Sequence, residues 1–450
     1  MPRAPQAVYS DEQRIAPPQM NHSQALVEAQ RCLYCFDAPC TQACPVRIDV
    51  PGFIKRLAEQ NYAGSGQLLF AANPLATTCG AVCPTADLCE GACVLRGLGQ
   101  RPIRIGALQY LVASQFQAVP LAGVEGFPYR VAIIGGGPSG LGCAATLRRL
   151  GCTTSIYERT PLLGGLANRV IPAYRLPQGT VEHDVALLEQ LDLDCHLQSE
   201  IDRSALEGLL RKHDAIFLGI GLSGCRGLAV PGGELAGVVQ AIEFLGQVRA
   251  FHQGKAARPE IGETVVVIGG GNVALDAAVT AKLLGAEQVL VLYRRSMEEM
   301  PAWSSEYVTA ASVGVEFRWL SKVEAIQGDD RRVQAVQVQP MRRTGAQSNG
   351  RRGVEADSRG LPYLLRCDTV LLALGQVLDS ELAEALALPL TQEGTLQVDP
   401  VTYQTGNPKV FAGGETVSGA ATVVSSLAVG MTAGRAIHRW LPEQGASNHV

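Results

Sequence analysis

The sequence predicts an α/β protein in which a small helical domain precedes two domains built on parallel β-sheets. Two observations carry this prediction. Eight of the 13 cysteines lie between Cys32 and Cys93, at short repeated spacings that are unusual for core residues. A hydrophobic strand followed by a glycine motif, a helix and a second strand occurs twice, with the first strands ending at Ile134 and Ile268.

Length and composition limit the function classes. The 450 residues leave room for about three domains. The chain is 47% hydrophobic and 18% charged, as is usual for soluble globular proteins, and its net charge of −4 gives no nucleic-acid footprint. No apolar run reaches the roughly 18 residues of a membrane helix, and the N-terminus has no secretory pattern. We therefore expect a cytoplasmic protein without a membrane or nucleic-acid partner.

Residues 1–116 are expected to form the helical domain. Prolines make residues 1–20 an extended lead-in. Apolar spacing and a possible cap at Ser23 predict a helix up to Arg31, a second follows Pro51, and a third covers Ile105 to Phe116. Bound metal would add cohesion to so small a domain.

The two cysteine runs indicate iron–sulfur clusters. Residues 32–45 have the form C-x2-C-x4-C-x3-C-P, which is close to the ferredoxin pattern. Residues 79–93 have the form C-x3-C-x5-C-x3-C, with a proline after the second cysteine. Disulfides would need an oxidising compartment, and structural zinc usually takes two C-x2-C pairs or Cys/His mixtures. Two [4Fe–4S] clusters are the favoured interpretation.

Eight ligands are needed for two such clusters. One cluster can be held by Cys32, Cys35 and Cys40. The fourth cysteine can cross to the second cluster, whose natural ligands are Cys44, Cys83, Cys89 and Cys93. Cys79 is then either the fourth ligand of the first cluster or a bystander, and the spacing leaves both open.

A linker at 117–129 leads to the first nucleotide motif. Gly135 permits a tight turn, Gly137 allows the backbone to approach a pyrophosphate, and Gly140 allows close packing of helix and strand. The helix start then faces the phosphates. At the end of the next strand, the carboxylate of Glu158 can accept the ribose hydroxyls of an adenosine.

The second nucleotide motif repeats this unit with one difference. Its loop residues are Gly269, Gly271, Asn272 and Ala274. The second strand ends at Arg294 and Arg295 and carries no acid there, which favours a 2′-phosphate and hence NADP(H) over NAD(H). The alternative is that both arginines face solvent.

Two such motifs imply two nucleotides, FAD in the first and NADP(H) in the second. Near the C-terminus a strand leads to Gly414 and Glu415, and a helix from about Ala421, with Thr422 at its start, can stabilise charge on a reduced flavin. The FAD domain is thus predicted to be split, with residues 130–255 and 376–450 surrounding an NAD(P)H domain at 256–375. Residues 217–224 and 371–376 are the predicted crossover strands.

With these motifs the chain resembles the electron-input module shared by dihydropyrimidine dehydrogenases and the small subunit of bacterial glutamate synthase. The likeness covers about residues 25–441. Besides the cysteine runs it includes VAIIGGGPSGL, the pair Gly164 and Gly165, IPAYRLP, VIGGGNVALD, YRRSMEEMPA and VFAGGE.

This resemblance implies particular ligands. In dihydropyrimidine dehydrogenases one cluster takes three cysteines and a glutamine, and the matching positions are Cys32, Cys35, Cys40 and Gln109. The second cluster matches Cys44, Cys83, Cys89 and Cys93, and Cys79 matches a non-ligand. Glutamate synthase small subunits carry Glu at the position of Gln109, so the glutamine favours the pyrimidine branch. The arginine pair favours the other branch, because the bacterial pyrimidine subunit that uses NADH lacks it. Glu415 departs from the family's aspartate.

The expected activity follows from the cofactors. NAD(P)H would reduce FAD, and electrons would pass singly through the clusters to a partner. The chain lacks the FMN barrel that would reduce uracil or thymine, so a separate catalytic subunit and a hetero-oligomer are expected. One alternative is a glutamate synthase small subunit-like NADPH oxidoreductase, and another is an iron–sulfur redox-sensing regulator. We find no Ser/His/Asp set, which argues against a hydrolase. We also find no C-x2-C in the flavin domain, which argues against a thioredoxin reductase-like enzyme.

Overall fold

The computed structural model describes residues 20–117, 126–329, 332–348 and 351–447, which form two compact units. The large unit comprises residues 17–168, 175–224 and 377–450, and the small unit includes residues 169–174 and 225–376. The predicted lead-in at residues 1–20 lies almost wholly outside the described residues, as does residue range 118–125 of the predicted linker.

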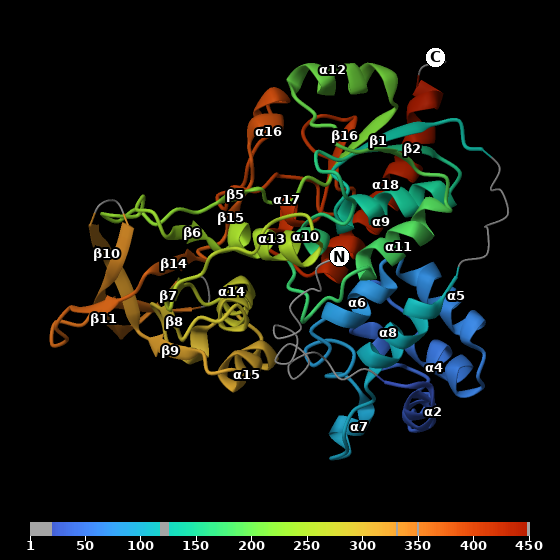
Figure 1. The fold of residues 1–450 in the computed structure, drawn as a ribbon. Helices are drawn as coiled ribbons and strands as arrows, with labels where there is room; N and C mark the ends of the chain where they lie inside the picture. Colours follow the sequence, from blue (N-terminus) through green and yellow to red (C-terminus); the bar gives the residue numbers. More distant parts are fainter. Residues whose placement is uncertain (1–19, 118–125, 330–331, 349–350, 448–450) are drawn as a thin grey trace. The chain divides into compact units, whose positions relative to one another are not determined.

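The first part of the large unit is helical, as predicted. Its helices are α2 (His22–Gln30), α3 (Pro39–Gln42), α4 (Val50–Ala58), α5 (Tyr62–Ala72), α6 (Ala76–Val82), α7 (Val94–Gly97) and α8 (Ile105–Gln115) (Figure 1). Helix α2 begins one residue before the expected cap, because Asn21 and Gln24 form a reciprocal capping box. The core of this helical domain contains Phe53, Ile54 and Leu57 from one face of α4.

A parallel sheet with strand order β16-β4-β1-β2-β3 forms the rest of the large unit. Its strands are β1 (Arg130–Ile134), β2 (Thr153–Tyr157), β3 (Asp194–His196), β4 (Ala215–Leu218) and β16 (Val410–Ala412). Its helices are α9 (Pro138–Arg149), α10 (Leu166–Arg169), α11 (Thr180–Glu189), α12 (Arg203–Lys212), α16 (Glu381–Ala385), α17 (Glu415–Ser418) and α18 (Val423–Ser447). Alternate strand residues face opposite sides, so that Ile133 packs with α9 and α18 while Ile134 packs with α12 and α16. We call this part the first nucleotide domain.

The helical domain and the first nucleotide domain share one core. Leu75 and Cys79, from the start and middle of α6, are 1% exposed and belong to the same apolar cluster as Val131 of β1 and Leu427 of α18. A Cβ atom on Gly142 of α9 would lie 2.6 Å from the carbonyl oxygen of Leu427, so α9 and α18 are in close contact. The iron–sulfur region is therefore packed directly onto the sheet domain.

The small unit contains a second parallel sheet, of order β6-β14-β7-β8-β9. Its strands are β6 (Val238–Gln240), β7 (Thr264–Ile268), β8 (Gln288–Tyr293), β9 (Glu316–Trp319) and β14 (Thr369–Leu372), and its helices are α13 (Ala241–His252), α14 (Asn272–Leu283), α15 (Ser304–Ser312) and the 3₁₀ turn η2 (Met297–Glu299). A separate antiparallel sheet, which the sequence motifs do not predict, consists of β10 (Ser321–Asp329), β11 (Arg332–Ser348), β12 (Arg351–Ala356) and β13 (Tyr363–Arg366) (Figure 1).

One predicted domain boundary is wrong. Residues 225–255 were assigned to the FAD domain, but β6 pairs with β14 as an edge strand of the second sheet, and α13 follows it in the small unit. The chain passes between the units at β5 (Gly224–Cys225) and β15 (Gln376–Val377), and these two short strands pair with each other. These two passages lie at the ends of the predicted crossover strands, residues 217–224 and 371–376.

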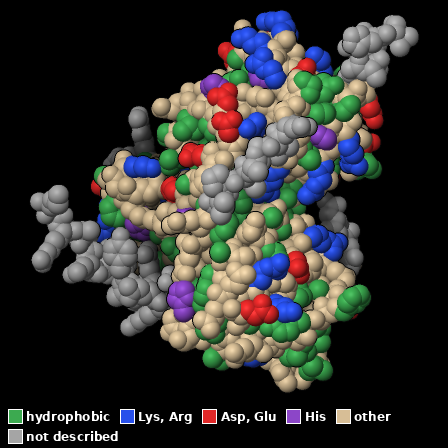
Figure 2. Space-filling model, turned by 90° about the vertical axis from the view of Figure 1, so that its right-hand side faces the viewer, with side chains coloured by type: hydrophobic (Ala, Val, Ile, Leu, Met, Phe, Trp, Pro, Cys, Tyr) green, Lys and Arg blue, Asp and Glu red, His purple; other side chains and the backbone are tan. Residues whose placement is uncertain are grey.

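The surface shows no single-sign charge field on the face drawn in Figure 2, where acidic, basic and apolar side chains are interspersed. None of the described helices combines the length and the apolar character needed to cross a membrane.

Candidate redox cofactor sites

The first glycine motif forms an open backbone groove between β1 and α9. Gly135 has a φ of +100°, and a Cβ atom on Gly140 would lie 1.9 Å from the carbonyl oxygen of Gly135. By contrast, a Cβ atom on Gly137 would have only the Cα atom of Gly165 within 4 Å, at 3.9 Å. Gly164 donates its N–H to the carbonyl oxygen of Gly136 at 2.8 Å, which holds the predicted Gly164–Gly165 pair beside the loop. The groove is thus lined by backbone and has room for a phosphate-bearing ligand.

Ser139, in the first turn of α9, was not predicted to contribute. It is 5% exposed, and its hydroxyl has no hydrogen-bond partner among the described residues. It lies against Gly414, where an added Cβ atom would approach the Cβ atom of Ser139 to 2.6 Å. A buried hydroxyl without a partner calls for a ligand or water, and the start of a helix favours an anion. The site therefore fits the pyrophosphate of FAD, and the available signal was a small hydroxyl residue within the glycine motif, directly before Gly140.

Glu158 lies where the sequence predicted, at the end of β2 and beside the glycine loop. Its side chain is buried, Oε2 accepts the N–H of Gly136 at 2.8 Å, and Oε1 accepts both the N–H and the hydroxyl of Thr160 at 2.9 and 2.7 Å. A carboxylate has further lone pairs, so these bonds fix its orientation and leave capacity for a ribose hydroxyl.

The C-terminal loop brings Gly414 and Glu415 to the same groove. Gly414 has a φ of +71°, and Oε1 of Glu415 accepts the N–H of Ala421 at 3.2 Å. Burial raises the pKa of the Glu415 carboxyl. Thr422 has a local role, because its hydroxyl accepts the N–H of Ser425 and caps the start of α18. A flavin contact by Glu415 or Thr422 stays a prediction.

The second glycine motif has the same open form. Gly269 has a φ of +149°, and no atom lies within 4 Å of a Cβ atom placed on Gly271. Ala274 is fully buried under the loop. The side chain of Asn272 is held by the chain itself, since its Oδ1 accepts the N–H of Trp303 at 3.0 Å. This groove fits the pyrophosphate of a second dinucleotide.

The arginine pair follows β8 beside this groove. Arg294 is exposed, whereas Arg295 is half-buried and its Nε has no hydrogen-bond partner within the described ranges. The next residue, Ser296, forms a capping box with Glu299. Glu298 of the same turn forms an ion pair with Arg343 of β11. The buried, unpartnered guanidinium nitrogen of Arg295 favours the interpretation that this arginine binds a phosphate over the alternative that it faces solvent.

One group of thiols surrounds a cavity in the helical domain. The cavity is lined by Cys32, Cys35, Cys40 and Cys93 together with apolar residues such as Ile54 and Ile103. Burial raises the pKa of Cys32, and it raises the pKa of Cys40 to about 11. Within the described ranges no three His, Cys, Asp or Glu side chains converge closely enough for a single metal ion, and these thiols instead line the cavity wall. Four thiols around one cavity are the donor set of a [4Fe–4S] cluster.

This first thiol group corrects the expected division of ligands. Cys93 was assigned to the cluster of Cys44, yet it lies with Cys32 and Cys40, whose pKa values its charge also raises. The physical reason is that Cys93 directly precedes α7, which the chain brings back to the first cysteine run.

The second thiol group consists of Cys44, Cys83 and Cys89, with Cys79 beside it. The thiols of Cys83 and Cys79 are hydrogen-bonded, and this contact and burial raise the pKa of Cys83 well above its usual range. Burial also raises the pKa of Cys44 and of Cys89, and each thiolate would raise the pKa of its neighbours. Cys83 packs against the core shared with the first nucleotide domain.

Gln109, which was expected to complete the cluster of Cys32, lies against α6, the helix that leads into Cys83 of the second group. It is 7% exposed, and its Nε2 donates to the carbonyl oxygen of Ala76 in α6 at 2.7 Å. Helices α6 and α8 approach closely, because a Cβ atom on Gly80 would lie 2.7 Å from the backbone nitrogen of Tyr110. The bond to Ala76 leaves Oε1 as the atom with which Gln109 can bind a metal.

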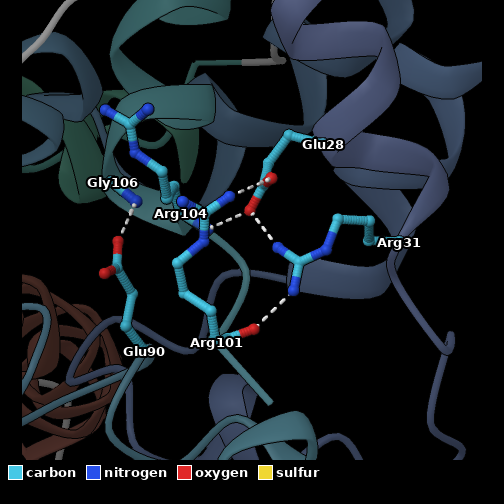
Figure 3. A network of polar contacts seen from close by, with 6 residues as sticks. All are labelled: Glu28, Arg31, Glu90, Arg101, Arg104 and Gly106. Atoms are coloured by element: carbon cyan, nitrogen blue, oxygen red, sulfur yellow. Dashed lines mark hydrogen bonds and ion pairs between the residues drawn. The ribbon is translucent and has the colours of Figure 1, made fainter.

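Two carboxylates, the buried Glu28 and the half-buried Glu90, hold the start of α8, the helix that carries Gln109 (Figure 3). Oε1 of Glu28 accepts the N–H of Arg104 at 3.0 Å and the guanidinium of Arg31 at 2.7 Å. Oε1 of Glu90 accepts the N–H of Gly106 at 3.0 Å, and burial raises the pKa of Glu90. These bonds replace the missing side-chain cap of α8 and fix its first turn.

Comparisons with known proteins identify the domains that contain these residues. The family model "Dihydropyrimidine dehydrogenase domain II, 4Fe-4S cluster" matches residues 10–120, and "Pyridine nucleotide-disulphide oxidoreductase" matches residues 129–434. These matches and the two grooves define an NAD(P)H-dependent flavoprotein oxidoreductase with an N-terminal iron–sulfur domain. The chain belongs to the pyridine nucleotide-disulphide oxidoreductases, in the family of the relatives described next.

The "NAD-dependent dihydropyrimidine dehydrogenase subunit PreT" of Escherichia coli K12 is 33% identical over 444 residues, covering 97% of this chain and 98% of the relative. The "Glutamate synthase [NADPH] small chain" of Halomonas elongata is 32% identical over 431 residues, covering 93% and 91%. Among solved structures, Mycobacterium tuberculosis FprA in complex with NADPH has a TM-score of 0.60 at 20% identity, covering 71% of this chain and 86% of that one. Lactococcus lactis thioredoxin reductase has a TM-score of 0.54 at 20% identity, covering 70% and 99%. Both structures show the fold alone.

The open groove at Gly137 gives a direct test of FAD binding. Replacing Gly137 by Val fills the space above the loop without backbone strain, since its φ is −77°. Crowding of this kind costs about 1–3 kcal/mol, so we expect FAD to bind roughly tenfold to a hundredfold more weakly, measured by flavin fluorescence titration of the apoprotein. Gly208 of α12 also faces open space, and Gly208→Val serves as the control that keeps its FAD. Unchanged binding by Gly137→Val would place the cofactor elsewhere.

Proposed function

We propose that this chain is the electron-input subunit of a two-component reductase, which oxidises NADPH and delivers electrons to a separate catalytic subunit. When bound, FAD and the clusters supply hydride acceptance and single-electron transfer. The observation that carries the proposal is the shared core, in which Cys79 lies with Val131 and Leu427 of the domain that has the FAD groove, and against which Cys83 of the second thiol group packs. This packing gives electrons a short path out of that domain.

The chain's own residues would hold two [4Fe–4S] clusters. The first ligand set is Cys32, Cys35, Cys40 and Cys93, and the second is Cys44, Cys83, Cys89 and Gln109. In the second set, Cys83 packs against the core shared with the first nucleotide domain, whereas its other two thiols and most of the first set pack in the core of the helical domain. We infer the order FAD, second set, first set, partner. A neutral amide ligand makes the second cluster less negative than four thiolates would, which raises its reduction potential.

The partner reaction is proposed to be of the dihydropyrimidine dehydrogenase type, the reduction of uracil or thymine on another polypeptide. Support comes from the relative named as a subunit of that enzyme and from Gln109. A role beside a glutamate synthase large subunit is the second candidate, favoured by Arg294, Arg295 and the NADPH in that relative's name. All 13 cysteines lie in the described residues as free thiols, which suits a reducing compartment such as the cytoplasm.

Anaerobic turnover tests the proposed function. Protein reconstituted with iron, sulfide and FAD should catalyse NADPH-dependent reduction of a viologen dye, because an electron-input subunit releases electrons without its partner. NADPH should also bleach both the flavin and the cluster absorbance. A redox sensor would hold clusters without turnover, and firmly bound zinc in place of iron would exclude the proposal.

The eighth ligand can be identified by iron content. Two clusters give about eight irons per chain. We expect Gln109→Ala to lose about half of them, because the second cluster loses a ligand, while Cys79→Ala keeps both clusters. Gln115, at the exposed end of α8, provides the control substitution Gln115→Ala. Iron loss in Cys79→Ala with full retention in Gln109→Ala would make the cysteine the ligand.

Nucleotide choice is the next prediction. A charge-assisted bond contributes about 1.5–3 kcal/mol, so loss of even one such bond on replacing Arg294 and Arg295 by Ala should raise KM for NADPH by roughly tenfold to a hundredfold. KM for NADH should change little, because NADH has no 2′-phosphate. Arg359 and Arg366 are exposed arginines of the same unit, and their replacement by Ala should alter neither constant. A wild type that prefers NADH would contradict this assignment.

A further inference from the structure

Helix α11 of the first nucleotide domain contacts both helices of the second thiol group. Asp184, in the middle of α11, is 1% exposed, and its two carboxylate oxygens accept the N–H groups of Thr77 at 3.1 Å and Thr78 at 2.8 Å. These are the second and third residues of α6, whose N-cap position is Leu75, a residue without a capping side chain. Asp184 thus supplies from another domain the cap that α6 lacks.

The neighbouring residue holds the other helix. Nε2 of His183 donates to the carbonyl oxygen of Ala113 at 3.0 Å, in the last turn of α8. A carboxylate at a helix start and an imidazole at a helix end both match the direction of the helix dipole. Two successive residues of α11 therefore fix the helix that contains Cys79 and ends at Cys83, and the helix that carries Gln109.

Burying the carboxylate of Asp184 costs free energy, which makes an acid an unfavourable choice for a residue that only fills space. Burial raises the pKa of Asp184, although the bonds from Thr77 and Thr78 oppose this shift. A buried carboxylate is tolerated only when its hydrogen bonds are made. Both carboxylate oxygens accept backbone N–H groups of α6. These hydrogen bonds offset the cost of burying the carboxylate, and they fix the start of that helix.

We propose that Asp184 and His183 are positioning residues that fix the second thiol group against the first nucleotide domain, and thereby set the rate of electron transfer from flavin to the second cluster. This inference rests on the proposed function. Helix α11 is suited to the task because Leu188, one turn after Asp184, lies in the shared core with Val131 and Cys79.

A second contact between the two domains provides a matched control. Arg149 of α9 donates to the carbonyl oxygens of Ala71 at 2.9 Å and Phe70 at 3.0 Å, and its guanidinium lies 5.0 Å from the centre of the Phe70 ring. It is also a charged side chain that binds helix backbone of the helical domain. However, α5 carries no cysteine, so this contact stabilises the domain pair without holding a cluster ligand.

The experiment compares Asp184→Asn, His183→Ala and Arg149→Ala in the full reconstituted chain, using anaerobic stopped-flow mixing with NADPH. Flavin bleaching and cluster bleaching are followed separately, and iron, FAD and thermal midpoint are measured for each variant. We expect Asp184→Asn and His183→Ala to reduce flavin at the wild-type rate and to reduce the clusters severalfold more slowly. Arg149→Ala should lose stability and keep the wild-type ratio of the two rates.

The outcomes separate this inference from the function on which it rests. If Asp184→Asn fails to hold iron, the test rests on His183→Ala and its ratio of cluster reduction rate to flavin reduction rate. The positioning role would be overturned if His183→Ala and wild type had the same ratio of cluster reduction rate to flavin reduction rate. It would also be overturned if this ratio fell as much in Arg149→Ala as in His183→Ala. Clusters that NADPH cannot reduce in the wild type would instead overturn the proposed function. An EPR-monitored redox titration measures the reduction potential of the second cluster in each variant. An unchanged potential would exclude a potential shift as the cause of slower cluster reduction.

Discussion

The structure depends on how the unpaired backbone N–H groups at its helix starts are satisfied. Three helices of the large unit illustrate this. Helix α8 is held by the carboxylates of Glu28 and Glu90, and α6 by Asp184 from another domain. Helix α9 has neither, and its first turn, with the unpartnered hydroxyl of Ser139, opens onto the glycine groove. The starts of α8, which carries Gln109, and of α6, which leads into Cys83, are thus held by protein acids, and the start of α9 beside the groove is left for a ligand.

The iron–sulfur region and the first nucleotide domain depend on each other for stability. Leu75 and Cys79 contribute to the core of the sheet domain, and Arg149 of that domain binds the end of α5. Substitutions in the sheet domain will therefore affect cluster retention, and loss of clusters will lower the stability of the FAD site, since metal binding is coupled to folding.

Much of this could be predicted from sequence because the motifs act locally. The glycine loops, Glu158 and the cysteine runs work through fixed spacings, and the structure has them at the ends of the expected strands. The division of the ligands could not be predicted, because Cys93 reaches the first cysteine run through the return of the chain at α7, and the place of Gln109 depends on the close approach of α6 and α8 at Gly80. The domain boundary failed for a similar reason, since β6 is a short, half-buried edge strand whose pairing with β14 no local pattern reveals.

The interleaving of the two thiol groups also bears on biosynthesis. The cavity of the first group takes Cys32, Cys35 and Cys40 from one run and Cys93 from the other, while Cys44 joins Cys83 and Cys89. A growing chain therefore has neither group complete until the second run has been made, however early its first cysteines leave the ribosome. Iron delivered sooner would meet at most three of the four thiols of the first group, so the order of residues itself postpones cluster insertion until the second run has been made.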